Sequence, residues 1–365
     1  MPRIVVFGAT GYTGKLTAEA LVARGERPVL AARSRDRLER LAGELGGGLE
    51  VAEADVGRPE SVRGLVERGD VLISTVGPFA RWGGPAVQAA LATGANYLDS
   101  TGEPAFIREV FERHGPAAEA AGCGLLTAFG YDWVPGNLAG ALALREAGQA
   151  AVRVDIGYFV TGRVGAGAMS GGTRASAATS ITAPSFAWRG GRLSTERGAR
   201  GYRTFDVRGK ALPGITVGSS EHFTLPRLAP RLQDVNVYLG WFGPASRPMQ
   251  ALSLLTQLPL VPQALGAVAG RLVKGSTGGP DAAARAASRS HVQALAYDAA
   301  GRMLTRVILE GPNGYTLTAA FLAWGASNAR ERGLAGSGAL GPVDAFGLDE
   351  LEAGCAEAGL SRGSP

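Results

Sequence analysis

Residues 4–14, IVVFGATGYTG, decide the fold of this chain of 365 residues. The four apolar residues 4–7 predict a short buried strand, and glycines follow at three-residue intervals, at Gly8, Gly11 and Gly14. Such a turn between a strand and a helix lets the chain reverse sharply, and a pyrophosphate can approach its backbone without a Cβ in the way. The helix also presents free N–H groups and the positive end of its dipole to the anion. We therefore predict a dinucleotide-binding turn, with an ordinary glycine-rich turn as the alternative.

The rest of the first 148 residues continues the pattern that this turn begins. Short apolar runs alternate with helical stretches, and strands are predicted at residues 28–32, 49–54, 71–76, 96–98 and 124–128. Strands that are apolar throughout and alternate with helices are typical of a parallel sheet covered on both faces. The predicted fold class is α/β, with a Rossmann-type, doubly wound parallel sheet over residues 1–148.

The sequence pattern changes after Gly148. Residues 152–160, VRVDIGYFV, alternate as a half-buried strand does, and residues 290–310 predict an antiparallel hairpin that turns near residues 298–301. We expect residues 149–320 to form a second, α+β domain that carries an antiparallel sheet. Residues 321–365 are expected to form a C-terminal helical segment that returns to the Rossmann domain.

The composition argues against several classes of protein. Lysine and arginine total 37 against 32 acidic residues, and the arginines are scattered among the acids, which favours an anionic small-molecule ligand over nucleic acid. Three histidines far apart and two cysteines predict neither a metal centre nor a disulfide scaffold. The chain runs directly into the strand at residues 4–7 without a signal-peptide pattern. We therefore expect a cytoplasmic protein that binds no metal and no nucleic acid.

Residues 248–270 carry no charged side chain over a length close to that of a membrane span. Pro259 and Pro262 interrupt this segment and three glutamines are distributed along it, a combination that a spanning helix seldom carries. The segment therefore predicts a buried helix pair, a dimer surface or an apolar lid over a hydrophobic substrate. A peripheral membrane anchor is the alternative.

The end of the second predicted strand distinguishes between the two pyridine dinucleotides. An NAD-specific site places an acidic residue about 20 residues beyond the glycine turn, where it accepts from the ribose 2′-hydroxyl. This chain has AARSR at residues 31–35, so Arg33 is expected to pair with a 2′-phosphate and Ser34 to donate to it. NADP(H) is therefore predicted in preference to NAD(H). Solvated residues at the start of a helix are the alternative.

Two further segments complete the predicted cofactor site. Asp55 and Val56 are expected to border the adenine ring, and a helix cap is the other role for this aspartate. Residues 74–79, STVGPF, end the fourth strand and are expected beside the nicotinamide ribose, with a Gly-Pro turn and a core phenylalanine as the alternative. The predicted cofactor-binding residues are Gly8, Thr10, Gly11, Tyr12, Thr13, Gly14, Arg33, Ser34, Asp55, Val56, Thr75, Val76, Gly77, Pro78 and Phe79.

Several motifs together resemble the saccharopine dehydrogenase-like oxidoreductases, nearest their trans-acting enoyl reductase branch. The motifs are GATGYTG at 8–14, AARS at 31–34, VGPFARWGGPAVQAALATGANYLDSTGE at 76–103, GYDWVPGNLAG at 130–140, SGGTRASA at 170–177 and GPNGYTLTA at 311–319. The resemblance implies a Rossmann domain, a substrate and dimerisation domain, and use of NADP(H) or NAD(H). Members of the family act on C–N bonds of opine-like amino acids or on C=C bonds of polyketide acyl chains.

Two departures from the family pattern bear on the substrate. The charged side chains by which opine-type members recognise a dicarboxylic amino-acid conjugate have no match in this sequence, and the uncharged residues 248–270 suit an apolar acyl ligand instead. Tyr131 stands where the enoyl reductase branch commonly carries phenylalanine, which leaves a shared role for this position in doubt.

The reaction that the resemblance implies requires a proton donor. Hydride transfer to a conjugated C=C bond leaves an enolate, which needs a hydrogen-bond donor at oxygen and a proton at the α-carbon. Tyr131 is the predicted donor and Asp132 is expected to orient it, with structural roles in a turn as the alternative. The predicted substrate contacts, for which caps and loop braces are the alternative, are Glu103, Ser170, Thr173 and Arg174.

The sequence thus predicts an NADPH-dependent oxidoreductase that reduces a C=C (enoyl) or C=N bond of a hydrophobic, biosynthetic small-molecule or acyl substrate. An opine-type amino-acid dehydrogenase is one alternative, and a non-catalytic NADP(H)-binding sensor or partner protein is another. The expected partners are the substrate, a second copy of the chain in a homodimer, and a carrier protein or a membrane surface.

Overall fold

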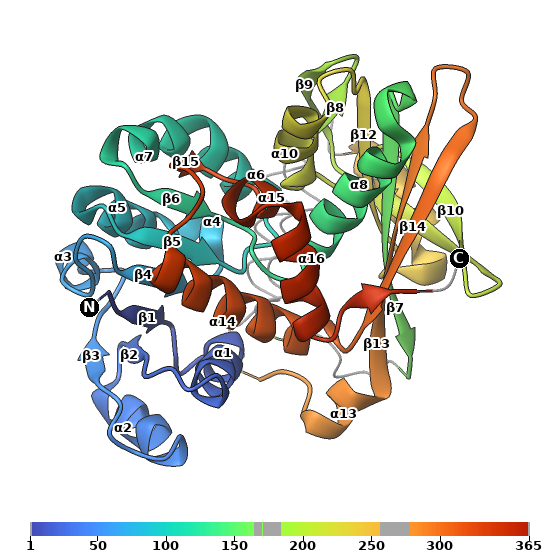
Figure 1. Ribbon diagram of the computed structural model, residues 1–365. Helices are drawn as coiled ribbons and strands as arrows, with labels where there is room; N and C mark the ends of the chain where they lie inside the picture. Colours follow the sequence, from blue (N-terminus) through green and yellow to red (C-terminus); the bar gives the residue numbers. More distant parts are fainter. Residues whose placement is uncertain (1, 164–169, 171–183, 256–277, 364–365) are drawn as a thin grey trace. The chain divides into compact units, whose positions relative to one another are not determined.

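The computed structural model describes residues 2–163, 170, 184–255 and 278–363 (Figure 1). The chain divides into two compact units, and each unit is assembled from segments that are distant in sequence. Unit 1 comprises residues 1–101, 106–134 and 314–354. Unit 2 comprises residues 102–105, 135–313 and 355–365.

Unit 1 is built on a seven-stranded sheet in which neighbouring strands are parallel. The strands, in spatial order, are β15 (Gly338–Ala339), β6 (Gly124–Leu126), β5 (Asn96–Asp99), β4 (Val71–Ser74), β1 (Ile4–Phe7), β2 (Val29–Ala32) and β3 (Val51–Glu53). The chain order reverses between β1 and β4, and ligands of open α/β sheets bind at such a switch point. The predicted Rossmann-type sheet is therefore confirmed.

Helices follow most of these strands, as the alternating sequence pattern predicts. They are α1 (Tyr12–Ala23), α2 (Arg35–Glu44), α3 (Pro59–Arg63), α4 (Phe79–Trp82), α5 (Gly84–Thr93), α6 (Pro104–Glu109), the π-helical turn η1 (Val110–His114), α7 (Gly115–Ala121), α14 (Gly314–Arg332), α15 (Pro342–Phe346) and α16 (Leu348–Glu357).

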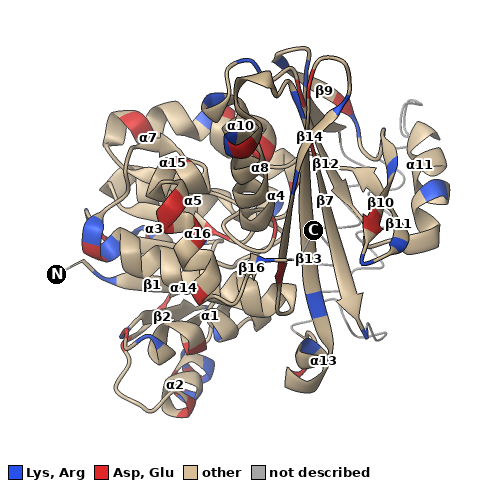
Figure 2. Cartoon of the chain, turned by 45° about the vertical axis from the view of Figure 1, so that its right-hand side comes forward, with Lys and Arg blue, Asp and Glu red and all other residues tan. Residues whose placement is uncertain are grey.

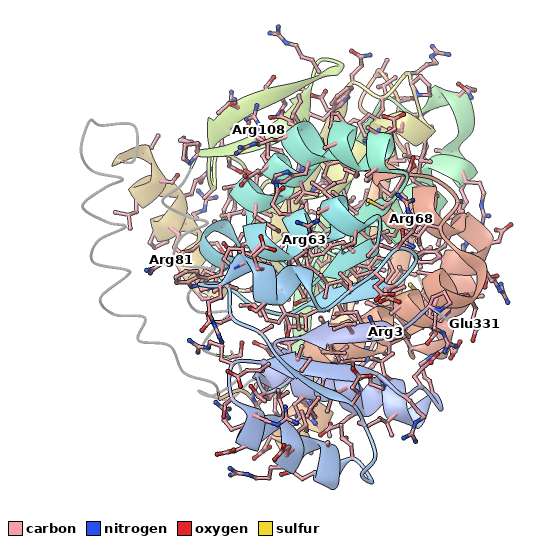
Figure 3. The ribbon with its side chains drawn as sticks, turned by 90° about the vertical axis from the view of Figure 1, so that its left-hand side faces the viewer. Arg3, Arg63, Arg68, Arg81, Arg108 and Glu331 are labelled. Carbon is pink, nitrogen blue, oxygen red and sulfur yellow. The ribbon has the colours of Figure 1, made fainter. Side chains whose placement is uncertain are left out.

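The core of unit 1 is closed by a helix from the far end of the chain. Every residue of β1 and of β4 is buried. The long helix α14 is buried over most of its circumference and packs against α1, β1, β4 and β5. At the amino end of the sheet, the backbone N–H and the guanidinium of Arg3 both bind the Asp70 carboxylate, at 2.7 to 3.2 Å, which ties the chain before β1 to the chain before β4 (Figure 3).

Unit 2 contains a mixed, nine-stranded sheet. Its strands are β7 (Arg153–Gly162), β8 (Pro184–Arg189), β9 (Arg192–Arg197), β10 (Tyr202–Val207), β11 (Lys210–Thr216), β12 (Asp234–Leu239), β13 (Ser288–Tyr297), β14 (Met303–Gly311) and β16 (Ser361–Arg362). The pair β7–β12 is parallel and the other pairs are antiparallel, including the predicted hairpin of β13 and β14. The helical elements are α8 (Val134–Ala147), η2 (Gly148–Ala150), α10 (Glu221–Leu228), η3 (Gly243–Ala245), α11 (Ser246–Leu255) and α13 (Ala282–Ala287).

The hairpin of β10 and β11 folds over one face of this sheet. β11 pairs with β12 only at Ile215 and Thr216, and the other end of the hairpin reaches β14, where the Arg208 guanidinium binds the Glu310 carboxylate at 2.7 and 2.8 Å. Between these two ends, the Phe205 ring meets the rings of Phe159 and Tyr238 at centroid distances of 5.4 and 5.3 Å. The hairpin therefore covers an aromatic cluster on the sheet.

The uncharged segment at residues 248–270 is described only in part. Residues 248–255 belong to α11, and residues 256–270 lie outside the described residues. Of the helices that are described, none has both the length and the apolar character needed to span a bilayer. Acidic and basic residues are interspersed over the helices and strands (Figure 2).

Candidate cofactor and active site

The glycine turn after β1 is built so that two of its glycines admit no side chain. Gly8 has a φ of +90°, a backbone conformation that favours glycine. A Cβ on Gly14 would lie 2.2 Å from the Gly8 carbonyl oxygen and 2.8 Å from Thr75 Oγ1. The turn is fixed to β2, because the amides of Gly8 and Ala9 both donate to the Ala31 carbonyl oxygen, at 2.8 and 3.1 Å.

The start of α1 suits an anion. Gly11 is the N-cap residue and supplies no side-chain cap, and the first turn of α1 contains no acidic residue. The first N–H groups of a helix have no acceptor within the helix, and the helix dipole adds a partial positive charge there. A Cβ on Gly11 would meet only the Gly8 carbonyl oxygen, at 3.2 Å. The turn and helix start therefore fit a diphosphate group.

The segment after β4 braces the glycine turn. Thr75 donates its backbone N–H to the Phe7 carbonyl oxygen at 2.9 Å, and its Oγ1 lies 3.2 and 3.3 Å from the carbonyl oxygens of Phe7 and Gly8. Beyond it, the Gly77–Pro78 peptide is cis, and the buried Phe79 ring packs against Phe106 at a centroid distance of 5.6 Å. The predicted contacts of residues 75–79 with the nicotinamide ribose stay a prediction.

The end of β2 and the start of α2 present basic groups next to the turn. Arg33 is exposed, and Ser34 is the N-cap residue of α2 but makes no side-chain capping bond. Arg35 pairs with Glu39 along the helix, at 2.9 Å. Arg37 instead reaches back to the glycine turn, where its Nη2 donates to the Thr10 carbonyl oxygen at 3.1 Å.

Arg37 is a candidate site residue that the sequence analysis missed. Its guanidinium lies beside the glycine turn, next to the helix start that bears Arg33 and Ser34. The spacing offered a signal, since Arg37 stands four residues after Arg33. Only the contact with Thr10, which is 27 residues away, shows that its side chain turns toward the site.

Asp55, the predicted neighbour of the adenine ring, makes contacts within its own loop. Its Oδ1 accepts from the Gly57 amide at 2.9 Å, and its own amide donates to Ser61 Oγ at 3.0 Å. These contacts shape the connection between β3 and α3. Both Asp55 and Val56 are half-buried.

Asp99, at the end of β5, anchors the loop that carries Tyr131 and Asp132. Its carboxylate accepts from the amides of Thr101 and Ala128 and from Thr127 Oγ1, at 2.8 to 2.9 Å. Burial raises the pKa of Asp99 to about 6, and the three donors act against this rise. The Asp99 carbonyl oxygen also accepts from the Phe129 amide at 2.7 Å.

The loop over residues 128–134 is held by hydrogen bonds from its own amides, whereas one carboxyl oxygen of Asp132 has no hydrogen-bond partner among the described residues. The Trp133 amide donates to the Ala128 carbonyl oxygen and the Val134 amide to that of Gly130, both at 2.9 Å. This oxygen, Oδ1 of Asp132, is buried. Burial raises the pKa of Asp132 to about 7. Desolvation of a carboxyl favours its protonated form, so Asp132 is a candidate for acid–base chemistry.

The predicted catalytic and substrate-binding residues lie in different units of the chain. Tyr131 is buried in unit 1, and the expected orientation of Tyr131 by Asp132 stays a prediction. Glu103 and Ser170 belong to unit 2 and are buried. Thr173 and Arg174 lie outside the described residues.

The strand order and the glycine turn define a Rossmann-type, dinucleotide-binding unit. Residues 4–124 match the family described as the saccharopine dehydrogenase NADP binding domain. This part of the chain is therefore similar to an NADP-binding domain, which supports NADP(H) as the cofactor.

Curated relatives of this chain match part of its length. It is 40% identical over 140 residues to the trans-acting enoyl reductase of Mycobacterium leprae (strain TN), covering 37% of this chain and 34% of the relative. It is 37% identical over 140 residues to the trans-acting enoyl reductase of Mycobacterium tuberculosis (strain ATCC 25618 / H37Rv), again covering 37% of this chain and 34% of the relative. The match thus spans about a third of these relatives' length.

A solved structure shares the fold over the whole chain. Apo saccharopine dehydrogenase (L-Glu forming) from Saccharomyces cerevisiae superposes with a TM-score of 0.60 at 13% identity, covering 100% of this chain and 99% of that one. The domain match at residues 4–124, the curated relatives and this shared fold together confirm the predicted resemblance to the saccharopine dehydrogenase-like proteins.

Proposed function

We propose that this chain is an NADP(H)-dependent oxidoreductase that reduces a C=C bond of an acyl substrate, with a C=N bond as the other candidate. The glycine turn of an NADP-binding domain carries this proposal, because its glycines permit the tight turn before α1, whose first amides can bind a diphosphate. The name of the similar proteins, trans-acting enoyl reductase, supports an enoyl bond. It also supports an acyl chain that a separate carrier protein delivers.

Residues of unit 1 would hold the cofactor. The amides at the start of α1 would bind the diphosphate, and Arg33, Ser34 and Arg37 would bind the 2′-phosphate. When bound, NADPH supplies a hydride to the β-carbon of the conjugated bond.

Asp132 is the proposed proton donor for the α-carbon. Its raised pKa, about 7, keeps a large share of the carboxyl protonated near neutral pH. One hydride and one proton together convert the C=C bond into a single bond. The Tyr131 hydroxyl is the proposed hydrogen-bond donor to the substrate oxygen, on which negative charge develops.

The test is a binding titration followed by a turnover assay. NADPH and NADH are titrated into the purified full chain by calorimetry, and NADPH absorbance is then followed with enoyl thioesters of increasing chain length and with cyclic imines. We expect NADPH to bind more tightly than NADH and to be oxidised with an enoyl thioester. Tight binding without turnover on any compound would favour the non-catalytic sensor. Failure of both nucleotides to bind would overturn the proposal.

A further inference from the structure

The first turn of α14 contacts two parts of the proposed site, although it lies far outside residues 4–124. At one end, the ring of Tyr315 meets the ring of Tyr12 edge to face, with centroids 5.2 Å apart and planes at 87°. Tyr12 is the first residue of α1, directly after the glycine that caps that helix. The turn therefore rests against the cofactor-binding helix.

One turn further along α14, Thr318 contacts the loop that carries Asp132. Its Oγ1 accepts from the Tyr131 amide at 2.9 Å and donates to the Gly314 carbonyl oxygen at 2.8 Å. A hydroxyl has one hydrogen and two lone pairs, so both bonds form together and fix its orientation. The side chain is buried, so water does not compete for the Tyr131 amide.

Two glycines make the fit between this turn and the loop close. A Cβ on Gly314 would lie 2.9 Å from a ring carbon of Tyr131, and a Cβ on Gly130 would lie 3.0 Å from the methyl carbon of Thr318. Each segment thus uses a glycine where the other presents a side chain. The loop has little room to shift relative to α14.

The bond from Thr318 differs from the others that hold this loop. The amides of Trp133 and Val134 donate to carbonyl oxygens within the loop, and the Phe129 amide donates to the neighbouring strand end at Asp99. The Tyr131 amide, which directly precedes the proposed proton donor, is held by a side chain 187 residues away.

We propose that Thr318 is a positioning residue that orients the Asp132 carboxyl by holding the backbone N–H of the preceding residue, Tyr131. Through the contact between Tyr315 and Tyr12, the same helical turn keeps the cofactor-binding helix and the Asp132 loop in fixed register. This inference rests on the proposed role of Asp132, and it adds a specific task for the motif at residues 311–319.

The test compares three variants of the full chain. Thr318→Val keeps the shape of the side chain and removes the acceptor for the Tyr131 amide, whereas Thr318→Ser keeps the hydroxyl. Thr93 on α5 is a matched control, because its Oγ1 makes the same bond to the preceding turn, to the Ala89 carbonyl oxygen at 2.9 Å. We expect Thr318→Val to lower kcat about 10- to 100-fold, with the KM for NADPH within about twofold of wild type. Thr318→Ser is expected to recover most of kcat, and Thr93→Val to leave it unchanged.

A second measurement does not depend on turnover. The titration of Asp132 is followed by carbon NMR of aspartate-labelled protein, and we expect its midpoint to move in Thr318→Val and to return in Thr318→Ser. If Thr318→Val keeps the wild-type kcat and titration midpoint, the inference is overturned while the proposed function stands. If Asp132→Asn also keeps the wild-type kcat, the role of Asp132 fails too. If Thr318→Val does not fold, Thr318→Ala is measured instead, and a wild-type kcat and a wild-type titration midpoint of Asp132 in that variant would overturn the inference.

Discussion

At the scale of single residues, the functional assignment depends on side chains whose environment the local sequence does not reveal. The glycines of the turn were predictable, because strand, turn and helix follow one another directly in the sequence. The contacts of Arg37 with Thr10 and of Thr318 with Tyr131 were not, since each joins segments that are distant in the chain.

The contact of Arg37 with the glycine turn leads to a test of cofactor preference. We expect Arg37→Ala to raise the KM for NADPH about tenfold or more, because a hydrogen bond to a charged phosphate is lost, and to leave the KM for NADH unchanged. Arg35→Ala is the matched control, as Arg35 is also exposed on α2 but pairs with Glu39. Equal effects of the two substitutions in initial-rate assays would contradict the assignment.

The raised pKa of Asp132 predicts how activity depends on pH. A proton donor must be protonated, so kcat is expected to fall as the pH rises through about 7. Asp132→Asn cannot donate this proton, and we expect it to lower kcat about 100-fold or more and to remove this limb of the profile. Measurements of kcat between about pH 5 and 9 would show this fall in activity. If kcat of Asp132→Asn still falls as the pH rises through about 7, another group is responsible for the pH dependence.

The same carboxyl affects stability with a definite sign. Its pKa is higher in the folded protein, about 7, than the ordinary value of 3.8, so the folded state binds more protons. The free energy of unfolding therefore falls as the pH rises between these two values, by up to a few kcal/mol. Denaturant titrations at about pH 4 and pH 8, near the two ends of this window, should show the stability of Asp132→Asn relative to wild type increasing with pH.

At the scale of elements, a glycine in the turn and a glycine in α2 differ in the space that is open to a side chain. A Cβ on Gly14 would meet backbone at 2.2 Å, so Gly14→Ala should cost about 2–3 kcal/mol of the free energy of unfolding and abolish NADPH binding. Gly43 in α2 has no neighbour within 4 Å of such a Cβ, and Gly43→Ala should stabilise the protein by about 0.5–1 kcal/mol. Thermal unfolding with and without NADPH measures both effects, and normal binding by Gly14→Ala would argue against the turn as the diphosphate site.

In the second sheet, periodicity in the sequence predicts the local hairpin but not the pairing of distant strands. The hairpin of β13 and β14 follows from two alternating runs around a turn, and it is present as predicted. The parallel pair β7–β12 and the folding of β10 and β11 across the sheet could not be read from the sequence. Both arise from pairing between strands that are distant in the chain, which alternation alone does not encode.

At the scale of the whole molecule, the predicted cofactor-binding residues all belong to unit 1, whereas the β10–β11 hairpin belongs to unit 2. Phe205 fills the aromatic cluster beneath that hairpin, so Phe205→Ala should lower the free energy of unfolding by about 3–5 kcal/mol. We expect the Kd for NADPH to change by less than about twofold, because no residue of the glycine turn is altered. Calorimetry on the folded variant measures this Kd. A large loss of affinity would contradict the prediction that NADPH binding does not depend on Phe205.

The return of α14 to the amino-terminal sheet sets the order in which the protein can mature during synthesis. The glycine turn leaves the ribosome some three hundred residues before the helix that covers β1, β4 and β5. A nascent chain that stops at the end of α8 would expose those strands to solvent and to chaperones. The nucleotide-binding unit therefore becomes complete only after α14 has been translated.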